Sequence, residues 1–330
     1  MTVGSGIGGQ VGIAAESTYG TYETPARFLP FTGSDLKKTK NSTDLSILGA
    51  GQLMKSGYGR VDTTKGGGGT LECPVVNKGM GLLLQALMGT TVTPAQQAAT
   101  AAYLQTHTLA DTVGKSLTVQ AGIPNVSGTA HPYSFLGCKV LGAEFGFEVE
   151  KEVTASFDLD ARDVTEGETL AAASFDTGLR PFVGTDTSIK VGAFGSEAAV
   201  TGVKKATVKF ERGLGVDRHY FGASGLKAEP NVQDFASVTG TISADLVDKA
   251  VWADRFRDDA EFSIVLEAVG AVIEGAYSHT FRITIPGCRL EGDTPTLSGQ
   301  EVVSGDFPFV ALFDGTNLPK IEVISTDTTV

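Results

Sequence analysis

The stretch VLGAEFGFEVEKEVTASFDLDAR, residues 140–162, alternates between apolar and polar side chains on both sides of a short charged segment. The apolar positions are Leu141, Ala143, Phe145, Phe147 and Val149, followed by Val153, Ala155, Phe157, Leu159 and Ala161. A period of two is typical of a β-strand with one buried face. We therefore predict a long antiparallel ribbon of two strands that turns near Glu150 and Lys151.

The polar face of this ribbon is acidic. The alternation places Glu144, Glu148, Asp158 and Asp160 on the side opposite to the phenylalanines. Because the apolar face must be covered by a core, we expect these four carboxylates to face water.

Two short blocks of sequence occur twice in the same order. Gly240-Thr241-Ile242-Ser243 lies 171 residues after Gly69-Thr70-Leu71-Glu72. Gly287-Cys288-Arg289-Leu290 lies 150 residues after Gly137-Cys138-Lys139-Val140, and this second offset extends to Phe157 and Phe307. Such self-similarity predicts two related domains in one chain. When the two domains are superposed, Cys138 should coincide with Cys288 and Phe157 with Phe307.

The predicted organisation is an N-terminal arm (1–26), a first domain (27–165), a linker (166–187) and a second domain (188–330). Each domain is expected to carry one short helix, over 78–88 and 246–257, the second capped by Asp245. A strand over 58–76 is interrupted by four glycines, 66–69. The long connections 41–57 and 212–231 are predicted to be mobile in the free protein and ordered after assembly.

Composition limits the function classes. The 330 residues carry 26 basic and 38 acidic side chains, a net charge of −12. This sign disfavours tight binding of nucleic acid but allows DNA to pass. No apolar run reaches the roughly 20 residues of a membrane helix, and no secretory signal is recognised, so membrane insertion is not expected. Three cysteines without a C-x-x-C spacing favour small buried side chains over a disulfide framework.

No motif indicates catalysis. The histidines His107, His131, His219 and His279 are too dispersed for a metal motif. Gly-rich segments at 4–9 and 65–70 lack the strand and helix that a nucleotide-binding loop requires. We therefore predict a protein that is not an enzyme and has no catalytic, cofactor-binding or metal-binding residues.

The N-terminal segment Gly12-Ile13-Ala14-Ala15-Glu16-Ser17-Thr18-Tyr19-Gly20-Thr21 is followed by Pro25 and the strand Phe28–Phe31. A long loop, a Gly-rich strand, a short helix, an aromatic strand ending in Gly-Cys and the acidic ribbon then follow in order. This combination resembles the major tail tube proteins of phages with long non-contractile tails.

The resemblance implies a mainly β fold of two tandem β-sandwich tail-tube domains, each with one short flanking α-helix. Long strands would join an intersubunit β-barrel around a channel, and a long loop and the terminal arm would reach into the neighbouring ring. Most relatives form sixfold rings of single domains, so a duplicated chain implies homotrimeric, pseudo-hexameric rings that stack.

The implied setting is the virion tail, with assembly in the host cytoplasm. The implied partners are further copies of the chain, the tape-measure and tail terminator proteins, and double-stranded DNA in transient, non-sequence-specific passage during ejection. Glu144, Glu148, Asp158 and Asp160 would face the lumen.

A two-domain β-sandwich adhesin or carbohydrate-binding module is the alternative. Such a binder is expected to expose aromatic side chains in a cleft and usually to carry a secretion signal. The chain has one tryptophan, on a predicted helix, which favours the tube protein.

Overall fold

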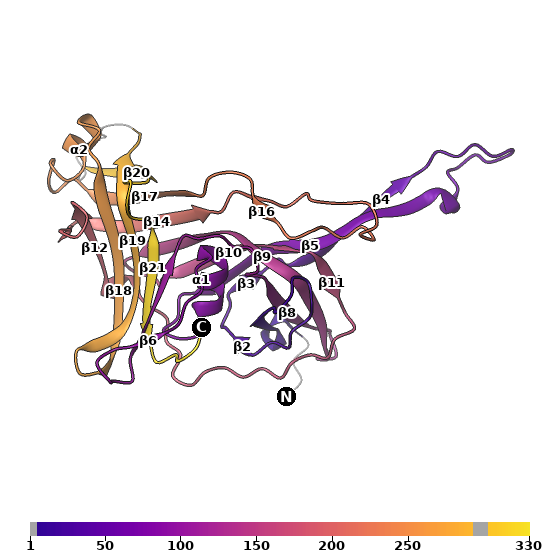
Figure 1. The fold of residues 1–330 in the computed structure, drawn as a ribbon, viewed down its shortest axis with the longest axis horizontal. Coiled ribbons are helices and arrows are strands. Elements are labelled where there is room, and N and C mark those ends of the chain that lie inside the picture. The colour runs from indigo at the N-terminus through magenta and orange to yellow at the C-terminus, as the bar shows by residue number, and fades with distance from the viewer. Residues whose placement is uncertain (1–4, 293–302) are drawn as a thin grey trace.

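The computed structural model describes residues 5–292 and 303–330. Strands dominate this part of the chain, which contains two α-helices, so the prediction of a mainly β fold is confirmed (Figure 1). Residues 1–4 of the predicted N-terminal arm and 293–302 of the predicted second domain lie outside the described residues.

The longest strand, β9 (Ala130–Glu148), organises the first half of the chain. Its beginning pairs with β8 (Leu117–Pro124), and its end pairs with β10 (Thr154–Ala161) as the sequence predicts. The other edge of β10 pairs with β5 (Arg60–Pro74).

The second half of the chain extends the same sheet. Strand β14 (Val203–Glu211) pairs with the end of β9, with Val208 opposite Phe145. Its other edge pairs with β17 (Ser237–Asp245), which in turn pairs with β20 (Ser304–Ala311). The order β5–β10–β9–β14–β17–β20 therefore combines strands from both halves in one continuous sheet, which we call the shared sheet.

A second layer packs on the apolar face of the shared sheet. Its strands, in order, are β12 (Thr187–Gly192), β18 (Phe262–Glu274), β19 (Tyr277–Leu290), β21 (Lys320–Ser325) and β7 (Tyr103–Thr108). Phe145 on β9 meets Phe281 on β19 with ring centroids 5.5 Å apart, and Phe147 stacks on the same ring. Buried side chains from both halves form one hydrophobic cluster between the layers.

The remaining strands have between two and eight residues. The strands are β1 (Gln10–Ala15), β2 (Arg27–Phe28), β3 (Gly33–Ser34), β4 (Lys37–Asp44), β6 (Ala95–Gln96), β11 (Asp163–Thr165), β13 (Ala198–Ala199), β15 (Leu214–Gly215) and β16 (Asn231–Val232). The single-turn 3₁₀ helices are η1 (Gly6–Gly8), η2 (Gly57–Gly59) and η3 (Gly184–Asp186). Strand β1 pairs with β8, so part of the predicted N-terminal arm belongs to a sheet.

The two helices fit the sequence unequally. Helix α1 (Gly81–Met88) is followed by Gly89, whose φ of +90° is the left-handed conformation that glycine adopts most readily. Helix α2 (Ala253–Arg257) is much shorter than the predicted 246–257. The prediction of Asp245 as its N-cap is wrong, because Asp245 ends β17 opposite Ser304.

Two hairpin arms leave the shared sheet in the same direction (Figure 1). The first hairpin arm, residues 37–65, consists of β4, an exposed turn and the start of β5. The predicted connection 41–57 is therefore partly strand. The second hairpin arm, residues 212–236, contains the short pair β15 and β16 and lies over the first half of the chain.

Candidate functional site

The polar face of the shared sheet carries the predicted site residues. Along β10 the side chains of Ala155, Phe157, Leu159 and Ala161 are buried, and the side chains between them are exposed or half-buried. This alternation confirms the predicted orientation of β10. Asp158 is exposed and accepts a hydrogen bond from the Thr70 hydroxyl on β5 at 3.2 Å.

The alternation on β9 contains an irregularity that the sequence does not reveal. Asp158 lies opposite Gly142, whereas the next residue, Leu159, lies opposite Val140, so Leu141 is an extra residue in β9. Val140 is buried and Leu141 is half-buried, and the prediction that Leu141 points into the core is wrong. Val149 lies beyond the strand and is 45 % exposed, which also contradicts its predicted orientation.

The four acidic residues differ in their surroundings. Glu144 and Asp158 are exposed in the middle of the face. Glu148 lies near the turn and forms an ion pair with Lys151 at 3.0 Å. Asp160 is covered by the second hairpin arm, where Lys227 forms an ion pair with it. Burial raises the pKa of Asp160, while the contact with Lys227 opposes that shift.

Two lysines of the second half stand beside these acids. In the pairing of β14 with β9, Lys209 lies opposite Glu144 and Lys205 lies opposite Glu148. Lys209 also forms an ion pair with Glu211 at 2.6 Å. Hydrogen bonding to Glu211 raises the pKa of Lys209, with smaller contributions from Asp158 and Glu144. The face is therefore mixed in charge rather than uniformly acidic.

The sequence predicts which strand face these lysines occupy but not which side chains lie beside them. Alternation in residues 203–211 predicts that Lys205 and Lys209 share a polar strand face. It does not tell which strand β14 joins, because the pairing partner comes from the other half of the chain.

The second hairpin arm is fixed to the first half by buried polar contacts. Lys139 on β9 is fully buried, forms an ion pair with Glu229 of this arm at 2.5 Å and donates to the Thr112 carbonyl. Burial lowers the pKa of Lys139, and Glu229 opposes that shift. Together with the Lys227–Asp160 pair, these contacts distinguish this arm from the first hairpin arm, whose turn is exposed.

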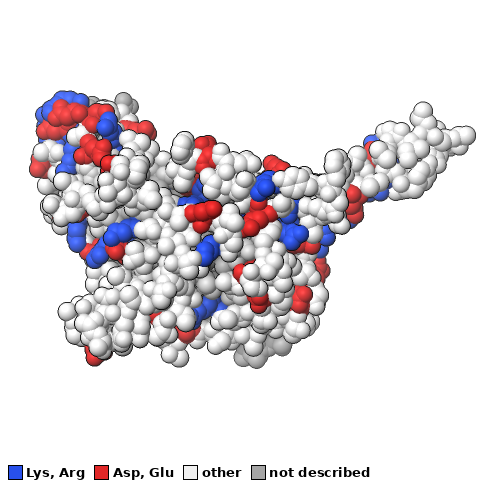
Figure 2. Space-filling view, viewed as in Figure 1, with Lys and Arg blue, Asp and Glu red and all other residues white. Residues whose placement is uncertain are grey.

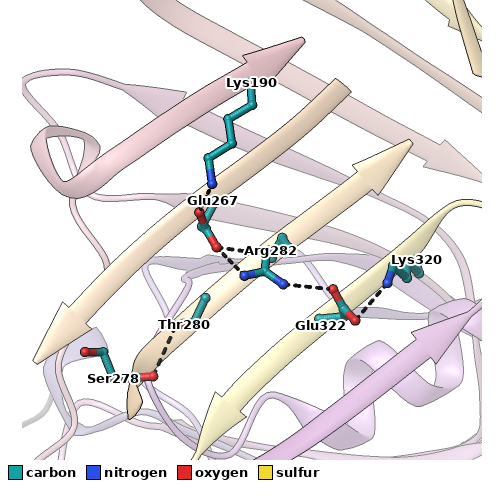
Figure 3. A network of polar contacts seen from close by, with 7 residues as sticks. All are labelled: Lys190, Glu267, Ser278, Thr280, Arg282, Lys320 and Glu322. Carbon is teal, nitrogen blue, oxygen red and sulfur yellow. Dashed lines mark hydrogen bonds and ion pairs between the residues drawn. The ribbon is translucent and has the colours of Figure 1, made fainter. Parts of the chain in front are cut away.

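An ion-pair network crosses the outer face of the second layer (Figure 3). Glu267 on β18 accepts from Lys190 at 2.6 Å and from Arg282 on β19. Arg282 reaches Glu322 on β21 at 3.3 Å, and Lys320 pairs with the same carboxylate at 2.9 Å. Burial alone would raise the pKa of Glu267, but hydrogen bonds from Lys190 and Arg282 hold it below its usual value. The network joins strands of one layer and gathers no nucleophile.

A family model described as a phage tail tube protein matches residues 6–311. The chain belongs to the phage tail tube protein family. No curated protein matches the sequence. Membership confirms the predicted resemblance and makes the chain a structural protein of the virion tail, which sets the adhesin alternative aside.

The three cysteines of this tail tube protein lie in its interior. Cys73, Cys138 and Cys288 are free and buried, and burial raises the pKa of Cys73 to about 12, so this thiol stays protonated. Within residues 5–292 and 303–330, no three His, Cys, Asp or Glu side chains are grouped to hold a metal ion. In the same part of the chain, no helix has the length and apolarity needed to cross a bilayer.

Proposed function

We propose that three copies of the chain close into a ring with pseudo-sixfold symmetry, and that stacked rings form the channel through which double-stranded DNA is ejected into the host. The observation that carries this proposal is the pairing of β14 with β9. It joins the edge of one half to the edge of the other, and repeating such a junction between chains would continue the sheet around a ring.

Corresponding strand registers support an internal duplication into units at 27–165 and 188–330. Phe157 on β10 lies opposite Leu71, and Phe307 on β20 lies opposite Ile242. These pairs are related by the two sequence offsets, 150 and 171. Cys138 lies opposite Leu117 and Cys288 opposite Phe262, so both cysteines also have corresponding places in a hairpin.

Ring closure has a physical reason. A sheet with long strands exposes unpaired backbone groups at its edges, and a closed barrel removes these edges. Closed point symmetry is the common solution for self-assembly, and six similar units require three duplicated chains. The main partners of the chain would then be further copies of itself. Tape-measure and tail terminator proteins would be additional partners, and assembly would take place in the host cytoplasm.

The polar face of the shared sheet would line the lumen. Its apolar face is covered by the second layer, so the face with Glu144, Glu148 and Asp158 is available to water. Asp160 lies on the same face of β10 but is covered by Lys227, so its contribution to the lining would be small. Carboxylates placed near Lys205 and Lys209 would keep the lining from binding DNA phosphates strongly.

Electron cryomicroscopy of assembled protein tests the proposal. We expect stacked rings with three chains and six similar units each, and with β9 and β10 at the channel wall. Rings of true sixfold symmetry with twelve units, or protein that stays monomeric under all assembly conditions, would contradict it.

A further inference from the structure

The two hairpin arms occupy corresponding positions in the two halves of the chain, but only the second arm packs against another part of the chain. Lys37 lies opposite Gly68 at the base of the first arm, and Lys209 lies opposite Thr239 at the base of the second. The two residues of each pair are 31 and 30 positions apart along the chain, respectively. The arms also share a short motif, because Gly49-Ala50 precedes Leu53 as Gly222-Ala223 precedes Leu226.

The second hairpin arm shows what such an arm contacts. It lies over the first half of the chain and covers Lys139, which is fully buried against Glu229. Its Gly225 reaches the base of the first arm, where the Gly225 carbonyl accepts from the Lys65 amide at 3.1 Å. The base of the first arm is thus a contact surface for the second arm.

The first hairpin arm has no such cover in a single chain. The turn of this arm carries Leu48, Leu53 and Met54 with exposed fractions of 98, 101 and 86 %. Figure 2 shows almost no charged side chain at the tip of this arm. Exposed apolar groups in one extended segment indicate a surface that is buried in an assembly.

The second half of the chain has a matching uncovered surface. Arg289 stands at the position of Lys139 in the repeat, but its side chain is 38 % exposed. Phe235 precedes β17, and Leu312 and Phe313 follow its antiparallel partner β20, so these three side chains lie at the same end of the strand pair. Phe235 is 93 % exposed and Phe313 is 64 % exposed. In the first half, the corresponding end of the sheet is the one beneath the second arm.

We propose that the first hairpin arm of one chain lies across the second half of the adjacent copy in the same ring, over Arg289, Phe235, Leu312 and Phe313. The first arm would contact the second half of that adjacent copy in the same way as the second arm contacts the first half of its own chain. This inference rests on the proposed ring, and it assigns the arm to a lateral neighbour rather than to the next ring. Both arms point in one direction from the sheet, as a ring of successive units requires (Figure 1).

A cysteine pair tests this assignment. A side-chain Cβ built on Gly225 would lie 3.4 Å from the Thr64 Cα, so this arm position closely approaches the arm base. When Leu226 of the second arm is aligned with Leu53 of the first arm, Gly225 aligns with Gln52. The 171-residue offset between the repeats aligns Thr64 with Phe235. We therefore choose Gln52→Cys with Phe235→Cys, whose predicted spacing suits a disulfide. The native cysteines are buried and do not compete.

After mild oxidation of assembled tubes, non-reducing gels should show covalent species that stop at the number of chains per ring seen in micrographs. Gln52→Cys alone should give none, and Gln52→Cys with Val126→Cys, at a distant turn where Val126 is 96 % exposed, should also give none. A ladder that continues beyond one ring would assign the arm to the next ring. Normal tubes without any covalent species would also overturn the inference.

Two further outcomes separate this inference from the proposed function. If the wild-type chain forms no rings, the proposed function fails first. If only the double variant fails to assemble, hydrogen exchange on wild-type tubes decides. Peptides containing Leu53 and peptides containing Phe313 should then both gain protection on assembly, and a lack of gain in either would overturn the inference.

Discussion

Glu144 on β9 lies directly opposite Lys209 on β14, and this pair marks the junction between the two halves of the chain. Opposite charges that face each other across neighbouring strands attract, although water weakens the attraction at an exposed site. The proposed lumen lining therefore carries both carboxylates and lysine side chains.

The ion pair between Lys227 and Asp160 should stabilise the docked second hairpin arm. Lys227→Ala leaves the mostly buried Asp160 carboxylate without its partner, which typically costs about 3 kcal/mol of unfolding free energy. We expect a loss of this size in urea unfolding at pH 7.

Two controls accompany this measurement. Lys227→Met combined with Asp160→Leu removes both charges and should restore most of the lost stability. Lys209→Ala breaks the exposed pair with Glu211 and should change stability by less than about 1 kcal/mol. A Lys227→Ala protein as stable as the wild type would show that the ion pair is unimportant.

Phe157 and Phe307 should be equivalent in energy as well as in position. Both rings are buried, and truncation of a buried phenylalanine to alanine typically costs about 3–5 kcal/mol. We expect Phe157→Ala and Phe307→Ala each to lower the unfolding free energy by that amount. Phe221→Ala, at a fully exposed side chain, should leave it unchanged. A neutral result for one buried position would argue against equivalent units.

Local patterns in the sequence predict individual strands better than their partners. The alternation around Phe157 predicts β10 because each side chain reports its own face. The extra residue at Leu141 escapes prediction, since an irregularity depends on the register with β10. The second helix is overpredicted because Val247, Val251 and Trp252 have helical spacing. Trp252 is instead buried in a stack with Phe307, with ring centroids 5.0 Å apart.

The candidate site shows the same division. Glu144 and Asp158 can be placed on an exposed face from the alternation alone. The neighbours Lys205 and Lys209, and the cover of Asp160 by Lys227, depend on contacts between distant segments that no local pattern contains.

His107 should make stability depend on pH. It lies on β7 with no exposed surface, and burial lowers its pKa from 6.5 to about 4. The unfolded chain therefore takes up a proton at a higher pH than the folded protein. This difference in pKa contributes about 3 kcal/mol to the free energy of unfolding. The contribution is fully present above pH 6.5 and is lost as the pH falls from 6.5 to about 4. His107→Leu should flatten the dependence of the unfolding free energy on pH in this window.

The two hairpin arms should differ in hydrogen exchange before assembly. The sequence predicts that 41–57 and 212–231 are both mobile in the free protein, but only the second segment is held by Lys227 and Glu229. We expect slow exchange in 225–231 of the free chain and fast exchange in 45–56, followed by slow exchange in both after assembly. Equal exchange of the two segments in the free protein would show that the buried ion pairs do not hold the second arm.

Charge reversal on the proposed lumen face should impair DNA passage without preventing assembly. Asp160 should be left unchanged, because reversal would place a second lysine beside the buried Lys227. Glu144→Lys with Asp158→Lys alters two exposed side chains and, together with Lys205 and Lys209, creates a group of four lysines. Such a group would bind phosphates and slow the DNA, more strongly at low salt than at high salt.

The measurement is the rate of DNA release from virions whose tails contain the variant. Lys205→Glu with Lys209→Glu is the matched control: it changes two side chains on the same face, makes that face more acidic and should not slow release. If both variants assemble into full-length tails and release DNA at the wild-type rate at low salt, the face does not meet the DNA. Slow release in the control as well would indicate a structural defect of the sheet rather than attraction of phosphate.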